Sequence, residues 1–429
     1  DGDSLISEAV STTWTIDGAD EGSSGSGIVF EGFSDLTGST FDDTFIFETG
    51  GSLSGVLDAG VGTNDTIDIS DIAGANTVNL QTTTISGLGG VSVNLDYQNA
   101  EIFIGDNTAD VLTVLDGGVT VNITGQNDGD VAGNTFTDFP NINGGTGDDT
   151  FAFVTAGSIT GALNGGGGTN TLGFSGSTGP VSVTMTGIGS TSGFLGNLTH
   201  GGDTAGFDNF STLNGSTSTD DLLLSDINAD GVWAIIGGVD TFTGSGRTLT
   251  FSAMEDLTGD SLIDTFTVTG AHTGTLSGSD GADVFNLNSG TLTGDIFGGD
   301  ADDVVTLTAG TITGVVHGDL GLDTLAGSTD YTVDAVNGGL ALNTGGFADV
   351  EDLVGTAAAD TFTITGIGSV NNVDGLNGTD VLNLAGKSPV VVTLTALGST
   401  DGFKGTSSEG INDLFDNIDT LAGGGGADT

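Results

Sequence analysis

Apolar and polar residues alternate in short runs along most of the chain. Phe285 and Leu287 alternate with Asn286 and Asn288, and Leu292 lies between two threonines. Alternation with a period of two is the pattern of a β-strand with one buried face. The runs are separated by Gly, Asn, Asp and Ser, which are typical of tight turns. The chain is therefore predicted to be all-β, with short strands joined by turns.

One turn pattern recurs: a glycine, four residues, an aspartate or asparagine, and an apolar residue two positions later. The copies at Gly259, Gly278, Gly298 and Gly318 begin 19, 20 and 20 residues apart. This period predicts a parallel β-solenoid (a β-helix or β-roll) whose stacked coils are about 20 residues long. Copies begin at Gly38, Gly60, Gly105, Gly144, Gly165, Gly215, Gly259, Gly278, Gly298, Gly318, Gly355, Gly375 and Gly423.

The apolar residue of each copy predicts a core row, because equivalent residues of stacked coils lie above one another. The intervals of 45 residues from Gly60 to Gly105 and 37 from Gly318 to Gly355 predict a hidden coil without the signature in each. The predicted core row is Phe45, Ile67, Leu112, Phe151, Leu172, Leu222, Phe266, Phe285, Val305, Leu325, Phe362 and Leu382.

A longer repeat lies over the short one. Residues 179–209 and 388–417 share the same order of residues, and Pro180 and Pro389 mark an offset of 209. We interpret each copy as an extended strand pair with a side loop, at about 171–214 and 380–422 of one continuous solenoid over residues 1–429. The chain begins and ends inside the turn pattern. This predicts end-to-end self-association or continuation in a longer chain.

Charge and composition exclude several kinds of partner and site. The 429 residues carry 58 acidic side chains against 3 Lys and Arg, a formal net charge of −55. Phosphate neutralisation needs Lys and Arg, so nucleic acid and anionic membrane surfaces are not expected partners. No cysteine is present, which excludes disulfides and thiolate metal sites. No apolar run is long enough to predict a membrane span.

The turn at Gly144, Gly145, Gly147 and Asp149 fits the nonapeptide template G-G-x-G-x-D-x-U-x. It resembles the repeats-in-toxin family, whose glycine turns supply carbonyls and whose aspartates bind calcium between coils. The resemblance implies Ca²⁺ as a cofactor at these four residues. Weaker matches extend it to Asp283, Asp303, Asp323, Asp380 and Asp428.

Two interpretations of the turn aspartates stay open. Calcium takes six to eight oxygen ligands, which stacked Gly and Asp turns offer. Stacking Asp283, Asp303 and Asp323 without a cation would also bring like charges close together. Alternatively, the aspartates cap their turns through bonds to the backbone while glycine supplies positive φ.

Most of the chain also resembles giant bacterial surface proteins of the β-strand-repeat and filamentous-haemagglutinin-like kind, with surface-layer proteins close behind. The resemblance implies an extracellular structural subunit of the bacterial cell surface (a stalk, fibre or layer). One alternative is an adhesin module that binds a cell-surface or glycan ligand through loops around Phe194 and Phe403. A remote alternative is a polysaccharide-active β-helix enzyme, but no catalytic constellation is recognisable, so we predict no enzyme activity.

Overall fold

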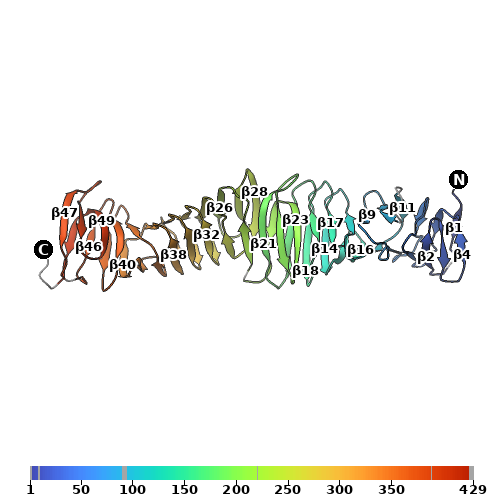
Figure 1. The fold of residues 1–429 in the computed structure, drawn as a ribbon, viewed down its shortest axis with the longest axis horizontal. Coiled ribbons are helices and arrows are strands. Elements are labelled where there is room, and N and C mark those ends of the chain that lie inside the picture. Colours follow the sequence, from blue (N-terminus) through green and yellow to red (C-terminus); the bar gives the residue numbers. More distant parts are fainter. Residues whose placement is uncertain (1, 8–9, 89–93, 220, 388, 425–429) are drawn as a thin grey trace. The chain divides into compact units, whose positions relative to one another are not determined.

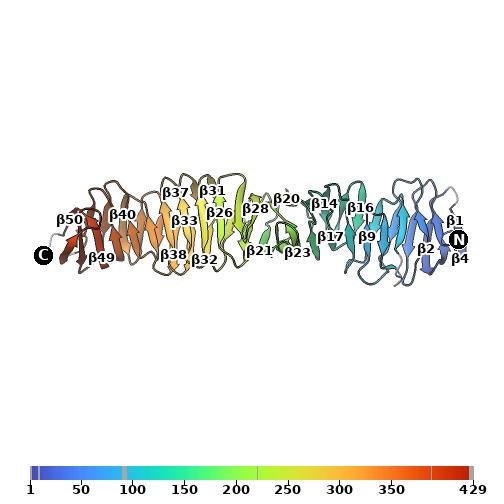
Figure 2. The ribbon, with the colours of Figure 1, turned by 90° about the horizontal axis from the view of Figure 1, so that it is seen from above.

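The computed structural model describes residues 2–7, 10–88, 94–219, 221–387 and 389–424, and in them the chain is all-β. None of the described residues forms a helix with the length and apolarity that a membrane crossing requires. The chain divides into two compact units, residues 1–183 with 187–218 (unit 1) and residues 184–186 with 219–429 (unit 2). Within each unit, successive strands follow one another in sequence order (Figures 1 and 2).

Unit 1 contains two sets of paired strands. In the first set, parallel pairing joins β1 (Ser4–Ile6), β5 (Asp35–Thr37), β7 (Val56–Asp58) and β11 (Leu95–Gln98). Antiparallel pairs connect β11 through β10 (Thr84–Ser86) to β9 (Thr77–Asn79). A second parallel run joins β9, β13 (Val111–Thr113), β17 (Asn141–Asn143), β19 (Ala162–Asn164) and β23 (Asp203–Phe210). β22 (Phe194–His200) is antiparallel to β23.

The second set of unit 1 has the same alternation of parallel and antiparallel pairing. β4 (Val29–Glu31), β3 (Glu21–Ser24) and β2 (Thr13–Gly18) are antiparallel. A parallel run joins β2, β6 (Thr44–Phe47), β8 (Thr66–Asp68), β12 (Ile102–Ile104) and β16 (Asn134–Thr137). Antiparallel pairs lead through β15 (Asp128–Val131) to β14 (Thr120–Gly125). A parallel run then joins β14, β18 (Thr150–Thr155), β20 (Thr171–Ser177) and β24 (Thr212–Asn214).

Unit 2 is built in the same way. Its first set joins β25 (Leu222–Ser225), β29 (Asp256–Thr258), β32 (Leu276–Asp280), β35 (Ile296–Asp300), β38 (Val315–Leu320) and β42 (Gly346–Ala348) in parallel. Antiparallel pairs lead through β41 (Gly338–Ala341) to β40 (Asp330–Ala335). β40, β44 (Thr361–Ile364), β46 (Val381–Asn383) and β50 (Thr420–Ala422) are again parallel.

The second set of unit 2 begins with antiparallel β28 (Arg247–Ser252), β27 (Asp240–Gly244) and β26 (Gly231–Ile235). A parallel run joins β26, β30 (Asp264–Val268), β33 (Val284–Leu287), β36 (Val304–Leu307), β39 (Thr324–Ala326), β43 (Asp352–Val354), β45 (Val370–Asp374) and β49 (Ile411–Ile418). Antiparallel β48 (Phe403–Ser407) and β47 (Val392–Leu397) follow. A short third set joins β31 (Ala271–Thr273), β34 (Thr291–Thr293) and β37 (Thr311–Ile312) in parallel. β21 (Ser182–Ile188) contributes residues to both units.

The predicted core row is buried, with one exception. Phe266 pairs with Phe285 and Phe285 with Val305 in parallel register, and the rings of Phe266 and Phe285 are stacked 4.9 Å apart. Every residue of the row is at most 4% exposed except Leu222, which is only half-buried. In that turn the structure buries Asp221 and Leu223, one residue later than predicted.

Antiparallel excursions occupy the long intervals between turn copies. β9, β10 and β11 lie between Gly60 and Gly105, and β40, β41 and β42 lie between Gly318 and Gly355. Between Asp323 and Glu351 the hydrogen-bonded register advances by 28 residues in one step. A longer segment with an added meander therefore replaces the hidden coil predicted for that interval. Similar excursions lie at β2–β4, β14–β16 and β26–β28, which the turn pattern alone did not predict.

Candidate functional site

Several of the buried aspartates that end the repeated turns accept a hydrogen bond from a backbone N–H of the preceding turn. The N–H of Asp264 donates to Oδ1 of Asp283 (2.7 Å), and that of Asp283 donates to Oδ1 of Asp303 (2.7 Å). Asp303 bonds to Asp323 in the same way (2.8 Å). All four side chains are at most 2% exposed. We call this succession of bonds the aspartate ladder. It also links Asp360 to Asp380 (2.9 Å).

The second carboxylate oxygen divides these turns into two kinds. In the first kind, Oδ2 accepts the N–H of the residue after the motif glycine, as from Gly145 to Asp149 (2.9 Å) and from Asp260 to Asp264 (2.9 Å). In the second kind, Oδ2 is buried and has no hydrogen-bond partner. Its members include Asp283, Asp303, Asp323 and Asp380.

Backbone conformation explains the difference. In these four turns, the residue after the motif glycine is left-handed: φ is 80° at Ser279, 115° at Gly299, 68° at Asp319 and 65° at Leu376. Oδ2 of Asp65 is also buried without a partner, and there the motif glycine itself, Gly60, is left-handed at 109°. A left-handed residue turns its N–H away from the carboxylate. The N–H of Leu376, for example, donates to Oδ1 of Asp374 (2.9 Å) instead.

Asn170 shows what this second kind of turn requires. Its turn also has a left-handed residue after the glycine, Gly166 at 75°. Its Oδ1 accepts the ladder bond from Asp149 (2.9 Å), while its Nδ2 donates to the carbonyl of Asn209 (3.0 Å). The position occupied by Oδ2 in the aspartate turns therefore faces a carbonyl oxygen and calls for a donor.

Burial raises the pKa of these aspartates, and neighbouring carboxylates raise it further. The pKa is about 7 for Asp283 and Asp323 and about 6 for Asp303 and Asp380. Desolvation disfavours the charged form, and an unbonded buried oxygen adds to that cost. Protonated Oδ2 would instead donate to the carbonyl, as Nδ2 of Asn170 does.

The motif glycine is required because the aspartate folds back over it. A methyl group on Gly278 would overlap Oδ2 of Asp283 and lie 2.6 Å from the carbonyl oxygen of Gly298. The recurring spacing of glycine and aspartate is thus a packing requirement of the turn as well as a sequence signature.

We expect Gly278→Ala to lower the free energy of unfolding by about 1–3 kcal/mol, because the methyl group forces the ladder apart. The control is Gly117→Ala, where a methyl group meets no atom within 4 Å. The control should change stability by less than about 0.5 kcal/mol. Urea unfolding of both variants measures the difference, and equal midpoints would contradict this account of the motif glycine.

The predicted metal residues lie in different places. Gly144, Gly145, Gly147 and Asp149 form one turn of unit 1, where Oδ1 of Asp149 accepts the N–H of Val119 (2.8 Å). Oδ2 is bonded to Gly145, so both oxygens already have backbone donors. Asp283, Asp303 and Asp323 are rungs of the unit 2 ladder. Asp428 lies outside the described residues.

Among the described residues, one group of three carboxylates has ligand atoms within 4.8 Å of one another: Asp380, Asp401 and Asp419. We call it the carboxylate cluster. Only Asp380 was predicted from the turn pattern, because Asp401 and Asp419 follow no glycine motif. Both can be located by aligning the two copies of the longer repeat. Asp401 directly precedes Gly402, the counterpart of Gly193, and Asp419 lies two residues after Asn417, the counterpart of Asn209. The first copy has serines at these positions, Ser192 and Ser211.

The aromatic residues of the side loops differ in exposure. Phe194 is fully buried, whereas Phe403 is 43% exposed. A ligand on the surface could therefore contact Phe403 but not Phe194. No family model and no curated protein matches this chain.

Proposed function

We propose that this chain is a structural module, a β-solenoid that serves in a stalk, fibre or layer at the bacterial cell surface. The observation that carries the proposal is the succession of parallel strand pairs in both units, with a core row and an aspartate ladder in register. In the 264–326 segment the register advances by 19 or 20 residues per step, which supports closed coils of about that length. Such an array is stabilised by contacts between neighbouring coils.

An exposed apolar face supports assembly by further stacking. On β47 and β48, Leu394 is 50% and Phe403 is 43% exposed. The corresponding residues of the first long-repeat copy, Met185 and Phe194, are fully buried. Apolar side chains exposed at positions buried in the other copy indicate a missing cover. We propose that a further β-strand layer from a second copy of the chain covers this face.

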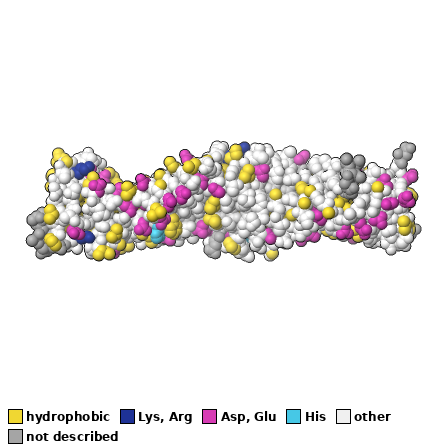
Figure 3. Space-filling model, viewed as in Figure 1, with side chains coloured by type: hydrophobic (Ala, Val, Ile, Leu, Met, Phe, Trp, Pro, Cys, Tyr) yellow, Lys and Arg dark blue, Asp and Glu magenta, His cyan; other side chains and the backbone are white. Residues whose placement is uncertain are grey.

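The acidic surface fits an environment that contains salt and divalent cations. Acidic side chains are distributed over the face of the molecule shown in Figure 3. Their mutual repulsion is reduced by salt or by bound divalent cations. Calcium as a stabilising ion, and an extracellular location where calcium is abundant, are part of the proposal.

We expect the chain to associate in a concentration-dependent manner in 0.15 M salt with calcium, and the Leu394→Ser, Phe403→Ser double variant to stay monomeric. Sedimentation velocity measures both. The control is Val232→Ser with Ile367→Ser, two residues 50% and 78% exposed on other strands or turns. It should associate like the unmodified chain. A chain that is monomeric at every concentration, or a double variant that still associates, would overturn the proposed assembly.

A further inference from the structure

The carboxylate cluster joins three separate segments of unit 2. Asp380 ends the turn that begins at Gly375, Asp401 lies in the loop between β47 and β48, and Asp419 follows β49. Backbone donors of the turn hold the two outer carboxylates. The N–H of Asp380 donates to Oδ2 of Asp419 (3.0 Å), and the N–H of Gly378 donates to Oδ2 of Asp401 (3.1 Å).

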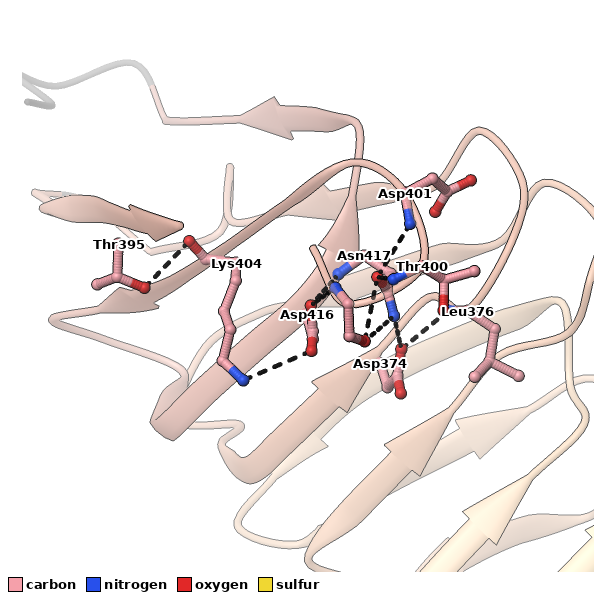
Figure 4. A network of polar contacts seen from close by, with 9 residues as sticks. Asp374, Leu376, Thr395, Thr400, Asp401, Lys404, Asp416 and Asn417 are labelled. Carbon is pink, nitrogen blue, oxygen red and sulfur yellow. Dashed lines mark hydrogen bonds and ion pairs between the residues drawn. The ribbon is translucent and has the colours of Figure 1, made fainter. Parts of the chain in front are cut away.

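Asn417 fixes the loop that carries Asp401 (Figure 4). Its Oδ1 accepts the N–H groups of Thr400 (2.8 Å) and Asp401 (3.3 Å). Its Nδ2 donates to Oδ1 of Asp374 (2.7 Å), the oxygen that also accepts the N–H of Leu376. The carboxylate of Asp401 points away from Asn417 in this view. The hydrogen bonds of the Asn417 side chain therefore hold the loop in place and leave Oδ1 of Asp401 without a partner.

Two oxygens of the cluster are buried and have no hydrogen-bond partner, Oδ2 of Asp380 and Oδ1 of Asp401. The Asp380 side chain is fully buried. A carbonyl oxygen lies beside it, because a methyl group on Gly375 would overlap the carbonyl of Asn417 and lie 2.6 Å from Oδ2 of Asp380. Acceptors thus face acceptors, an arrangement that costs free energy unless a cation or protons occupy the space.

The first copy of the long repeat has the same backbone frame with neutral side chains. The carbonyl of Asn170 accepts the N–H groups of Ser211 and Thr212, as the carbonyl of Asp380 accepts those of Asp419 and Thr420. Oδ1 of Asn209 accepts hydrogen bonds from the N–H groups of Thr191 and Ser192, as Oδ1 of Asn417 accepts those of Thr400 and Asp401. Asn170, Ser192 and Ser211 therefore stand where the second copy has Asp380, Asp401 and Asp419.

The neutral copy satisfies its own buried amide, since Nδ2 of Asn170 donates to the carbonyls of Gly167 (2.9 Å) and Asn209 (3.0 Å). The acidic copy replaces that donor by an acceptor and adds two more carboxylates. Lys404 on the same excursion does not supply the missing charge there, because its Nζ pairs with Asp416 at 3.5 Å.

We propose that Asp380, Asp401 and Asp419, with the carbonyl oxygen of Asn417, bind one calcium ion that joins the β47–β48 loop to the Gly375–Asp380 turn. Three carboxylates and a carbonyl are hard oxygen ligands, and calcium accepts irregular sets of six to eight that include water. Magnesium demands a tighter octahedron, so calcium is the preferred ion. The assignment names an ion site within the proposed calcium-stabilised module, and it is tested separately from association.

The test counts calcium ions on the 429-residue chain after removal of bound metal with EDTA. Isothermal titration in 0.15 M NaCl, which weakens diffuse binding by exposed carboxylates, should resolve a tight class of sites. The triple variant Asp380→Asn, Asp401→Ser, Asp419→Ser restores the side chains of the first copy. We expect it to lose one tight site and to lose part of the calcium-induced rise in melting temperature, while melting in EDTA no lower than the unmodified chain.

Two matched variants make the result specific. Asp96→Asn, Asp334→Asn, Asp413→Asn removes three exposed charges and should keep the tight site. The reverse triple variant Asn170→Asp, Ser192→Asp, Ser211→Asp should gain one tight site in unit 1. Equal calcium counts in the unmodified chain and the first triple variant would overturn the assignment. So would a tight site that prefers magnesium over calcium. The association measured for the proposed function would be untouched by either result.

Discussion

Replacing Phe285 by alanine is expected to lower the free energy of unfolding by about 3–5 kcal/mol. The ring is fully buried and stacks on Phe266 at 4.9 Å with an interplanar angle of 6°. Phe266 in turn stacks on Trp233 at 5.3 Å. Removing the ring leaves a cavity at the end of this stack, between Phe266 and Val305, and the flanking strands are hydrogen-bonded on both sides and cannot close it. Urea or thermal unfolding measures the loss.

Phe297 provides a matched control two strands away. It is half-buried and stacks on His317 at 4.7 Å, on the side of the strand opposite to buried Ile296. Phe297→Ala should therefore cost less than about 1.5 kcal/mol. If both substitutions cost the same, the buried row would not be the main source of stability in unit 2.

Stability is expected to fall as pH rises from 5 to 8. Asp283 and Asp323, with pKa values of about 7, and Asp303, with a pKa of about 6, keep protons in the folded chain that the unfolded chain releases near 3.8. Between these pKa values the folded state binds more protons than the unfolded state. Each unit by which the pH rises therefore lowers the free energy of unfolding. The contribution is complete below about pH 4 and is lost above about pH 7. Melting temperatures across this range in EDTA measure the trend.

Asparagine substitution isolates the three rungs. Asp303→Asn should stabilise the chain by about 1–2 kcal/mol at pH 8 and by little at pH 5, because its Nδ2 would donate to a carbonyl as Nδ2 of Asn170 does. The triple variant Asp283→Asn, Asp303→Asn, Asp323→Asn should reduce the pH dependence and leave the part that Asp264 and Asp380, with pKa values of about 6, contribute. A triple variant that is less stable than the unmodified chain at pH 8 would contradict the conclusion that these three aspartates favour the neutral form in the folded chain.

Asp149→Asn is the opposite case. Both oxygens of Asp149 accept backbone N–H groups, from Val119 and Gly145. In the asparagine variant, the side-chain NH₂ group would face one of these backbone N–H groups, so two donors would meet without an acceptor. This substitution should therefore destabilise the chain by about 1–3 kcal/mol at pH 8. The same chemical change is thus expected to have opposite signs at two turns that look alike in sequence.

The sequence by itself predicted much of the fold for a physical reason. Alternating apolar residues and a turn glycine at regular spacing leave few arrangements other than stacked strands with an inward row, and Phe45, Phe151, Phe285 and Phe362 are buried as expected. It failed at Leu222, where an adjacent pair of acidic residues, Asp220 and Asp221, left the register ambiguous by one. It also missed the meanders, because antiparallel strands use the same alternation as parallel ones.

The chemistry of the turns was decided by tertiary structure. Aspartates with the same spacing from a glycine differ in whether Oδ2 meets an N–H. Each unbonded Oδ2 of this kind accompanies a left-handed residue at the motif glycine or directly after it. The approach of Asp401 and Asp419 to Asp380 depends on loops that no local pattern positions. The sequence determined the all-β structure and the buried apolar row, because these follow from local alternation and turn chemistry. Only tertiary structure decided which carboxylates are bonded, which are left unpaired and which come together, because that depends on contacts between residues about 20 to 40 positions apart.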